Sequence, residues 1–323
     1  MSFWAGRKVL VTGGAGFIGH RLTRKLVDFA AEVKVVDDLS KGSLANLKDL
    51  TGRIEFTNVN LLDADVAKRL LRDMDTCFHL AAKIGGIGYF HKSPAVSLRD
   101  NSVMNFNLWD AAMGTDTKMV CLSSSMVFER TRIFPTPERA LEECPPPLSG
   151  YGFSKLVAEY IARDYNEQHG IKYLIVRPFN AYGPGETPGD YVGYAHVIPD
   201  LVKKTLQGQY PLEILGSGEQ TRSYTYVDDI SDAIIYLSER FENDDFNIGT
   251  GIETSVMNLA RKIWKLCGRK EPFEAKHLPA FKYDVQKRVP DVTKIHKVGW
   301  RPRVSLDDGL ATTVAWLKKQ FQA

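Results

Sequence analysis

Tyr151 and Lys155 are a pair of residues whose types and spacing could do chemistry. They stand four positions apart in a stretch that predicts a helix, so their side chains share one helix face. A tyrosine phenol has an ordinary pKa near 10, and acting as a base near neutral pH requires a shift of about three units, part of which a neighbouring ammonium group supplies. Ser124 follows the preceding predicted strand, where its hydroxyl could hold a substrate hydroxyl or carbonyl oxygen. The three residues predict proton transfer at a hydroxyl-bearing carbon.

The spacing by itself is not specific, because Tyr283 and Lys287 repeat it. Tyr151 differs in following both a serine-ended strand and a glycine-rich turn near the start of the chain. The alternative is that Tyr151 is an ordinary tyrosine at the start of a helix. We interpret the second copy as chance or surface packing and Tyr151 as the catalytic candidate.

Residues 14–19 read Gly-Ala-Gly-Phe-Ile-Gly and lie between a strand predicted over residues 8–12 and a helix. Glycines at this spacing permit a tight turn and a close backbone approach, and the helix start offers N–H groups to a pyrophosphate. Asp37 ends the next predicted strand, near the spacing of about 20 residues expected for an acid that binds a ribose. Together these features predict a dinucleotide site, with a glycine-rich packing turn as the alternative.

Asp37 also bears on the choice of dinucleotide. Its carboxylate can accept hydrogen bonds from free ribose hydroxyls, but it repels a 2′-phosphate by about 4 kcal/mol at about 4 Å and an effective dielectric constant near 20. NAD is therefore predicted over NADP, although Lys34 and Lys41 could offset part of the repulsion. The positive ring of oxidised NAD would add to the effect of Lys155 on the Tyr151 phenol.

Strands and helices alternate along the first half of the chain. We expect strands over residues 8–12, 33–36, 54–56, 76–80, 119–122 and 173–177, with helices over about 17–27, 64–74, 97–113 and 151–169. Such alternation predicts an α/β fold of the Rossmann type, a doubly wound parallel sheet with a smaller C-terminal α/β substrate-binding lobe. Prolines and glycines cluster from residue 178 onward. The predicted NAD-binding domain therefore spans 1–177 plus about 222–247, and the lobe spans about 178–221 plus 248–323.

Composition narrows the function classes. Lysine and arginine total 42 against 39 aspartates and glutamates, a net charge of +3 over 323 residues, so no general nucleic-acid surface is implied. The four cysteines lie far apart without a C-x-x-C pair, which argues against a metal site and against disulfides and fits a reducing compartment. The sequence shows neither a signal-peptide pattern nor an apolar run of about 20 residues, so we expect no membrane contact and a cytoplasmic location.

Further motifs make the sequence similar to the extended short-chain dehydrogenase/reductase superfamily, in its branch of NAD-dependent nucleotide-sugar epimerases and dehydratases. The shared segments span nearly the whole chain and include residues 79–82, 177–185 and 226–229, beside the glycine turn and the Tyr151 motif. The resemblance implies that Ser124, Tyr151 and Lys155 are catalytic and that a nucleotide-diphosphate sugar is the substrate. It also implies a homodimer formed through the helices near residues 97–113 and 151–169.

The same resemblance supplies the remaining candidate site residues. Cofactor contacts are implied for Gly13, Gly16, Phe17, Ile18, Gly19, Asp37, Asp38, Asn60, Leu61, Leu80, Ala81, Ala82, Asn101, Tyr151 and Lys155. Substrate contacts are implied for Gly86, Ser125, Met126, Asn180, His196, Val197, Arg222 and Arg288. Asn180 would approach the substrate diphosphate, and the two arginines would pair with its phosphates, since a guanidinium fork suits bidentate contacts. Solvated surface charges are the alternative for both arginines.

Residues 83–88, 196–199 and 220–225 resemble the enzymes that make GDP-fucose and the products of GDP-mannose 3,5-epimerase, which slightly favours a GDP-sugar. Those families use a cysteine and a second acid or base. His196 matches the second group, but Met126 stands at the cysteine position. A thioether carries no transferable proton, so 3,5-epimerisation is disfavoured. His196 could equally contact a substrate hydroxyl or cap the helix that follows it.

The 4,6-dehydratases also resemble the chain, but Ser125 and Met126 occupy the positions of their Asp-Glu pair. Without that acid and base, the elimination of water lacks its proton carriers. Oxidation at C4 and return of the hydride to the other face need only the residues that are present, so a nucleotide-sugar 4-epimerase is the leading prediction. A C4 dehydrogenase that releases the 4-keto sugar is the runner-up. A binding protein that responds to NAD and catalyses no reaction is the alternative outside the enzymes.

Overall fold

A computed structural model of the chain describes residues 2–84, 93–188, 195–280 and 285–322. Seven parallel strands form its main sheet in the order β11-β6-β5-β4-β1-β2-β3. They are β1 (Lys8–Thr12), β2 (Glu32–Asp37), β3 (Ile54–Asn58), β4 (Thr76–His79), β5 (Lys118–Leu122), β6 (Tyr173–Pro178) and β11 (Asp244–Ile248). The strand order reverses between β1 and β4. The carboxyl ends of these two strands therefore flank a topological switch point, where open α/β sheets bind ligands.

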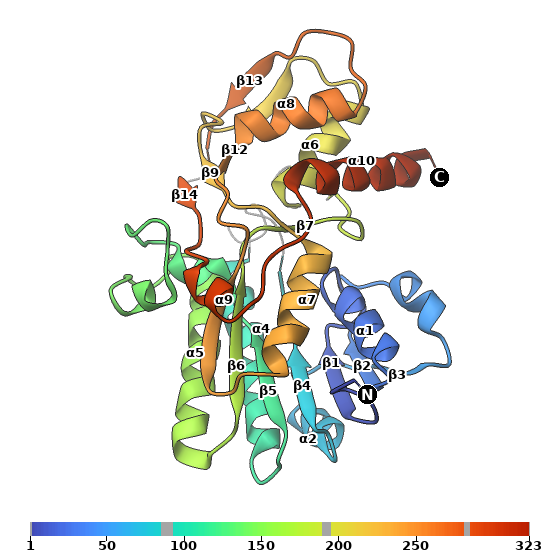
Figure 1. Cartoon of the computed structure of the whole chain (residues 1–323), viewed down its shortest axis with the longest axis vertical. Coiled ribbons are helices and arrows are strands. Elements are labelled where there is room, and N and C mark those ends of the chain that lie inside the picture. Colours follow the sequence, from blue (N-terminus) through green and yellow to red (C-terminus); the bar gives the residue numbers. More distant parts are fainter. Residues whose placement is uncertain (1, 85–92, 189–194, 281–284, 323) are drawn as a thin grey trace.

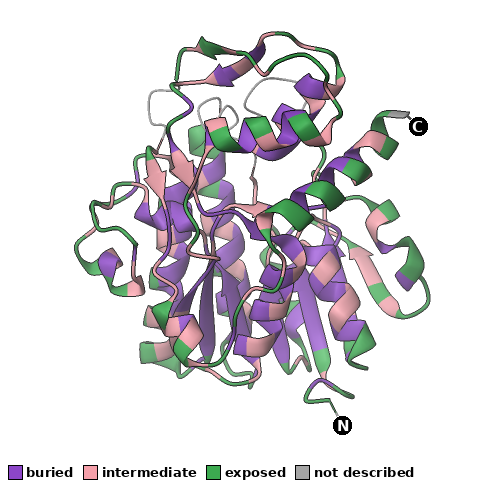
Figure 2. Cartoon of the chain, turned by 45° about the horizontal axis from the view of Figure 1, so that its top comes forward, coloured by how far each residue is buried: buried purple, intermediate pink, exposed green. Residues whose placement is uncertain are grey.

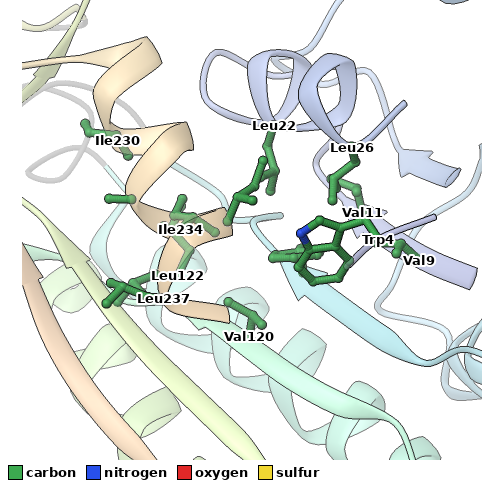
Figure 3. Close-up of a cluster of buried hydrophobic side chains, with 14 of the residues drawn as sticks. Trp4, Val9, Val11, Leu22, Leu26, Val120, Leu122, Ile230, Ile234 and Leu237 are labelled. Carbon is green, nitrogen blue, oxygen red and sulfur yellow. The ribbon is translucent and has the colours of Figure 1, made fainter. Parts of the chain in front are cut away.

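One face of the sheet is covered by α1 (Gly19–Asp28) and α7 (Val227–Ser238), which lie side by side in Figure 1. Successive side chains of a strand point to opposite faces, and Val9 and Val11 of β1 point to this one. Figure 3 shows them in one buried cluster with Leu22 and Leu26 of α1 and Ile234 of α7. The two leucines are four positions apart, which places both on the helix face towards the sheet.

The opposite face is covered by α2 (Ala64–Leu71), α4 (Pro94–Ala112) and α5 (Gly150–His169). Leu10 of β1 and Cys121 of β5 point into this second cluster. The hydroxyl of Ser149 accepts a hydrogen bond from the backbone nitrogen of Gly152 at 3.1 Å and so caps the start of α5. Gly170 ends the helix in the left-handed conformation, with a φ of 71°. Both ends of α5 are thus set by local sequence, and its first turn carries Tyr151.

We expect Ile234→Val to lower the free energy of unfolding by about 0.5 to 1.5 kcal/mol, because it removes one buried methyl group from the α7 side of the sheet. Ile234 is 0% exposed, whereas Ile252 is 65% exposed and provides the matched control. Urea unfolding of both variants checks the prediction. Equal stability losses for Ile234→Val and Ile252→Val would contradict the packing described for α7.

A second group of elements lies at the top of Figure 1, above the main sheet. It contains α6 (Val197–Leu206), α8 (Val256–Leu266), α10 (Leu306–Gln322) and a parallel pair formed by β8 (Leu212–Leu215) and β13 (Ala275–Leu278). Leu201, Leu259 and Leu310 belong to a separate buried cluster that holds these helices together. In Figure 2 the central strands of the main sheet are buried, while the outer helix surfaces carry exposed residues.

Short elements complete the chain. They are β7 (Ala181–Tyr182), β9 (Thr221–Arg222), β10 (Thr225–Tyr226), β12 (Thr254–Ser255), β14 (Lys287–Arg288), α9 (Thr293–Lys297) and the 3-10 turns η1 (Leu44–Leu50), η2 (Ser125–Phe128) and η3 (Glu138–Glu142). β9 lies between β12 and β14 in a three-stranded sheet. This small sheet lies between the main sheet and the upper helices in Figure 1.

The predicted Rossmann-type α/β fold, with its parallel sheet and smaller lobe, is confirmed. β11 was not predicted from the sequence, because this edge strand opens with the charged residues Asp244 and Asp245, whereas a parallel strand usually reads as an apolar run. The division into domains at residues 178, 222 and 248 stays a prediction. Among the residues that the structure describes, none of the helices has the length and apolarity that a membrane crossing requires.

Candidate active site

The carboxyl ends of β1, β4 and β5 open into a cavity of about 780 Å³. Its lining runs from the glycine turn after β1 to the strands β9 and β14. One continuous cavity therefore touches both the main sheet and the elements above it. Its volume lies within the range of about 300 to 1,000 Å³ that is typical of small-molecule sites.

The turn between β1 and α1 accepts only glycine at two positions. Gly13 has a φ of +69°, and a Cβ there would lie 2.7 Å from the nitrogen of Ala81. A Cβ on Gly19 would lie 2.0 Å from the oxygen of Gly13. Within the described structure, no side chain caps α1 and no acid stands in its first turn. The glycine cradle and this helix start fit the pyrophosphate of a dinucleotide.

Asp37 ends β2 and faces the glycine turn. Its carboxylate accepts hydrogen bonds from the backbone nitrogens of Ala15 at 3.0 Å and Leu39 at 2.9 Å. The residue lines the cavity, and burial raises the pKa of its carboxyl. A carboxylate held in this way fits the recognition of ribose hydroxyls that the sequence predicts.

Lys83 also lines this region, although the sequence did not single it out as a site residue. Its ammonium donates to the carboxylate of Asp38 at 2.5 Å and to the hydroxyl of Ser40 at 3.0 Å. Although burial opposes the ionisation of Asp38, the hydrogen bonds that Lys83 and Ser40 donate to its carboxylate hold its pKa below the ordinary value. Lys34, which was expected to offset the charge of Asp37, instead pairs with Glu55 at 2.9 Å. The position of Lys83 just after β4 was the available signal, since that strand end borders the switch point.

Ser124, Tyr151 and Lys155 meet at the cavity wall between β5 and α5. Ser124 accepts a hydrogen bond from the backbone nitrogen of Met126 at 3.2 Å and is hydrogen-bonded to the Tyr151 phenol. The ammonium of Lys155 lies 5.9 Å from the centroid of the Tyr151 ring and donates to the carbonyl of Leu122 at 2.6 Å. The spacing of four residues on α5 thus brings phenol and ammonium to the same wall.

The pKa of the Tyr151 phenol is raised, whereas a base near neutral pH requires it to be lowered. Burial raises the pKa of Tyr151 to about 12, although the Ser124 hydrogen bond and the charge of Arg288 act in the opposite direction. In the protein by itself burial prevails, and the lowering of this pKa that we expect from Lys155 together with oxidised NAD stays a prediction. Ionisation of Tyr151 near neutral pH requires further positive charge in the cavity.

Arg222 and Arg288 are far apart in the sequence but adjacent in the structure. β9 and β14 are parallel neighbours, and the two arginines are register partners in that pair. Both line the cavity, as does Asn180, whose side-chain amide donates to the carbonyl of Ser223 at 3.1 Å. Two neighbouring guanidinium groups fit the charge and geometry of a diphosphate.

His196 immediately precedes α6, and its Nδ1 is hydrogen-bonded to the carboxylate of Glu186. His196 is the N-cap residue of α6, as one alternative expected, but its side chain makes no capping hydrogen bond and bonds Glu186 instead. Both residues line the cavity, with His196 49% and Glu186 13% exposed. The charge of Glu186 raises the pKa of His196, against burial and the charges of Lys41 and Arg288. Glu186 was not predicted as a site residue, since ten residues separate it from the histidine in the sequence.

We expect Glu186→Gln to lower the pKa of His196, because the neutral amide no longer favours the imidazolium ion. In the unaltered protein His196 then keeps its proton to a higher pH than an ordinary histidine. The Glu186 contact stabilises the fold fully below the unfolded-state pKa, and this contribution is lost as the pH rises through the raised value. NMR titration of the histidine signals measures the pKa, with the other histidines as internal controls, and urea unfolding at several pH values measures the stability contribution. A His196 signal that titrates identically in the two proteins would contradict the assignment.

The structure brings most of the predicted site residues to the cavity wall. The cofactor candidates that line it are Gly13, Gly16, Phe17, Ile18, Gly19, Asp37, Asp38, Asn60, Leu61, Leu80, Ala81, Ala82, Tyr151 and Lys155. The other candidates that line it are Ser124, Ser125, Met126, Asn180, His196, Val197, Arg222 and Arg288.

One predicted site residue, among those that the structure describes, does not join this lining. Asn101 lies in the interior, where its side chain accepts from the Lys83 nitrogen at 2.7 Å and donates to the Ser154 hydroxyl at 3.2 Å. It therefore holds the segment after β4 and does not face the cavity. Gly86 lies outside the described residues, as does Tyr283 of the second tyrosine–lysine motif. Lys287 of that motif pairs with Glu253 at 2.7 Å.

Known proteins resemble the chain over nearly its whole length. UDP-glucuronic acid decarboxylase 3 from Arabidopsis thaliana is 34% identical over 307 residues, which cover 94% of this chain and 86% of the relative. The crystal structure of UDP-glucose 4-epimerase with UDP-glucose from Thermotoga maritima has a TM-score of 0.87 at 34% identity, covering 97% of this chain and 99% of that chain. A dTDP-glucose 4,6-dehydratase from Streptomyces venezuelae with NAD bound has a TM-score of 0.88 at 28% identity, covering 98% of each chain.

A family model, that of the NAD dependent epimerase/dehydratase family, covers the glycine turn, Tyr151 and Lys155. It matches residues 9–249, which include the seven strands of the main sheet except the first residue of β1. The chain belongs to the NAD dependent epimerase/dehydratase family.

Proposed function

We propose that the protein is an NAD-dependent nucleotide-sugar 4-epimerase that acts through oxidation at C4 of the sugar. The observation that carries this proposal is the meeting of Ser124, Tyr151 and Lys155 on the wall of a cavity that the paired arginines of β9 and β14 also line. NAD, when bound, supplies a positively charged acceptor that can take up a hydride and return it. The glycine turn and Asp37 would hold it, and the arginines would hold the substrate diphosphate.

In this proposal the protein residues move and hold protons. Tyr151 takes the proton of the C4 hydroxyl, and Ser124, already hydrogen-bonded to the phenol, holds the same oxygen. The Lys155 ammonium stabilises the resulting phenolate. The 4-keto sugar then turns, so that its opposite face lies towards the cofactor. In the return step, Tyr151 gives the proton back to the C4 oxygen. Neither step needs an acid at Ser125 or Met126.

The identity of the nucleoside is a separate part of the proposal. The slight preference for a GDP-sugar gains no support from the relatives named above, whose names carry UDP or dTDP. We therefore propose a UDP-sugar as the first substrate to test.

A decarboxylase is a second candidate, favoured by the name of the Arabidopsis relative. Oxidation at C4 of a sugar with a carboxylate on C5 yields a β-keto acid, which loses carbon dioxide. The catalytic residues required for the oxidation are the same. The C4 dehydrogenase that releases its 4-keto sugar and the non-catalytic NAD binder remain further alternatives.

Incubation of the NAD-loaded protein with UDP-glucose, UDP-galactose, UDP-N-acetylglucosamine, UDP-glucuronic acid, dTDP-glucose and GDP-mannose tests these proposals. The sugar NMR spectrum and the absorbance of reduced cofactor are followed together. A C4 epimer without accumulated NADH is the expected result. A pentose with released carbon dioxide would make the protein a decarboxylase, and NADH with a 4-keto sugar would make it a dehydrogenase. No change with any sugar would overturn the epimerase proposal and favour the binder.

We also propose a homodimer through the outer surfaces of α4 and α5, which pack side by side. Val96, Phe106 and Phe153 lie on these helices and are 41%, 44% and 37% exposed, an apolar surface of the kind that marks an interface. We expect Phe106→Glu to convert a dimer to a monomer in sedimentation measurements. A single-chain mass for the unaltered protein would overturn the proposal.

The four cysteines are free, and the cytoplasmic location stays a prediction.

A further inference from the structure

A buried ion pair lies directly behind the Ser124, Tyr151 and Lys155 site. Glu159 of α5 and Arg177 of β6 are both 0% exposed. Arg177 donates to the two carboxylate oxygens of Glu159 from Nε at 2.7 Å and from Nη2 at 2.6 Å. Burying two charges costs free energy that an apolar pair would not, so stability by itself does not explain this pair.

Glu159 belongs to the same helix face as the catalytic candidates. Tyr151, Lys155 and Glu159 are spaced four residues apart along α5, so each lies one turn beyond the previous one. The phenol and the ammonium face the cavity wall, and the carboxylate lies one turn deeper in the protein. The helix therefore links the reacting groups to the ion pair within two turns.

The ion pair also holds the chain on both sides of Ser124. The Ser123 hydroxyl donates to Glu159 at 2.5 Å. The guanidinium carbon of Arg177 lies 5.2 Å from the ring centroid of Phe128, which ends the turn that follows Ser124. The backbone at Ser124 is extended, with φ −158° and ψ 151°, so neighbouring side chains point in opposite directions. With Ser123 directed at Glu159, Ser124 is directed at the Tyr151 phenol.

The carboxylate of Glu159 further affects the charge of Lys155. Burial lowers the pKa of Lys155, and the Cys121 thiol and Glu159 act in the opposite direction. The lysine faces an uncharged carbonyl, that of Leu122, so a nearby negative charge matters for retaining its proton. Other charged or titratable groups around the lysine and the ion pair are His79 of β4, Arg163 of α5, Asp245 of β11 and Lys294 of α9.

We propose that Glu159 is a positioning residue for the active site: its buried carboxylate orients Ser123, and through it Ser124, and places a negative charge one helical turn from Lys155. The proposal rests on the proposed function, in which Ser124 and Lys155 act on a sugar hydroxyl. The ion pair is then retained, despite the free-energy cost of burying it, because it sets the geometry and the charge of that site.

Glu159→Gln in the NAD-loaded protein is the main test. Glutamine retains the shape but not the charge, and Asp245, 2.5 Å from Arg177, leaves that guanidinium with an anion. The alkaline limb of the pH profile of kcat/KM is expected to move to lower pH, because Lys155 loses its proton more readily. Glu167→Gln, at an exposed position of the same helix, is the matched control and should leave the limb in place.

Ser123→Ala tests the positioning part separately, since it keeps the ion pair intact. We expect kcat to fall by about tenfold, because the orientation of Ser124 becomes less well defined. KM and the alkaline limb of the pH profile should stay unchanged. Rescue by Ser123→Thr, which restores a hydroxyl, should recover most of the loss. An unchanged kcat in Ser123→Ala would overturn the positioning role, including in the case that Glu159→Gln does not fold.

A titration that needs no turnover separates this inference from the proposed function. In protein with ¹³C-labelled lysine, the Lys155 signal is the one that Lys155→Met removes. The inference requires that signal to titrate at lower pH in Glu159→Gln than in the unaltered protein, whether or not any sugar is converted. An unmoved signal would overturn it, as would a variant that only melts at lower temperature while its pH profile stays the same.

Discussion

Tyr151→Phe is expected to reduce kcat by roughly 10² to 10⁴, because it removes the group that takes and returns the proton of the sugar hydroxyl. The ring remains, so the packing of this buried side chain and the start of α5 persist. NAD binding should change little, since the glycine turn and Asp37 are separate from the phenol. Turnover of the UDP-sugars and NAD titration by fluorescence measure the two properties independently.

Tyr160→Phe is the matched control for this prediction. It lies on the same helix, is 59% exposed, and loses the same hydroxyl. Its activity should equal that of the unaltered protein. If Tyr151→Phe retained activity within tenfold of the unaltered protein, Tyr151 would not be the base. Loss of NAD binding in that variant would instead assign the phenol to the cofactor site.

Asp37→Asn is expected to change the ratio of NADP to NAD affinity by roughly 10² to 10³ in favour of NADP. The reason is the loss of a like-charge repulsion of about 4 kcal/mol between a carboxylate and a 2′-phosphate. One of the two backbone hydrogen bonds to Ala15 and Leu39 is also lost, which weakens both dinucleotides together. The ratio of the two dissociation constants therefore reports the charge effect, and calorimetry measures it.

Asp28→Asn, at the far end of α1, provides the control, since its carboxylate pairs with Arg53 on an exposed surface. The affinity ratio should stay unchanged there. An unchanged ratio in Asp37→Asn would mean that the cavity excludes the 2′-phosphate by volume and not by charge. Lys83 and Asp38, which are hydrogen-bonded to each other and line the same cavity, would then be the candidates for that exclusion.

Sequence reasoning succeeded where interactions are local. The glycine turn joins adjacent elements, and the tyrosine and lysine are one helical turn apart, so spacing determines which residues share a wall. The pairing of Arg222 with Arg288 was different. Each was a candidate by resemblance, but their adjacency depends on the register of β14 on β9, which no local pattern specifies. The edge strand β11 was missed because its paired acids break the apolar run expected of a parallel strand.

The sequence by itself determined the alternation of strands and helices, the dinucleotide turn and the candidate base, because each depends on residues close together in the chain. Only the tertiary structure decided how these groups are charged and held. It directs Lys155 at the Leu122 carbonyl, places Glu186 beside His196 and sets Glu159 against Arg177. Such pairings join distant segments in a medium of low polarity, where burial and a single neighbouring charge decide protonation.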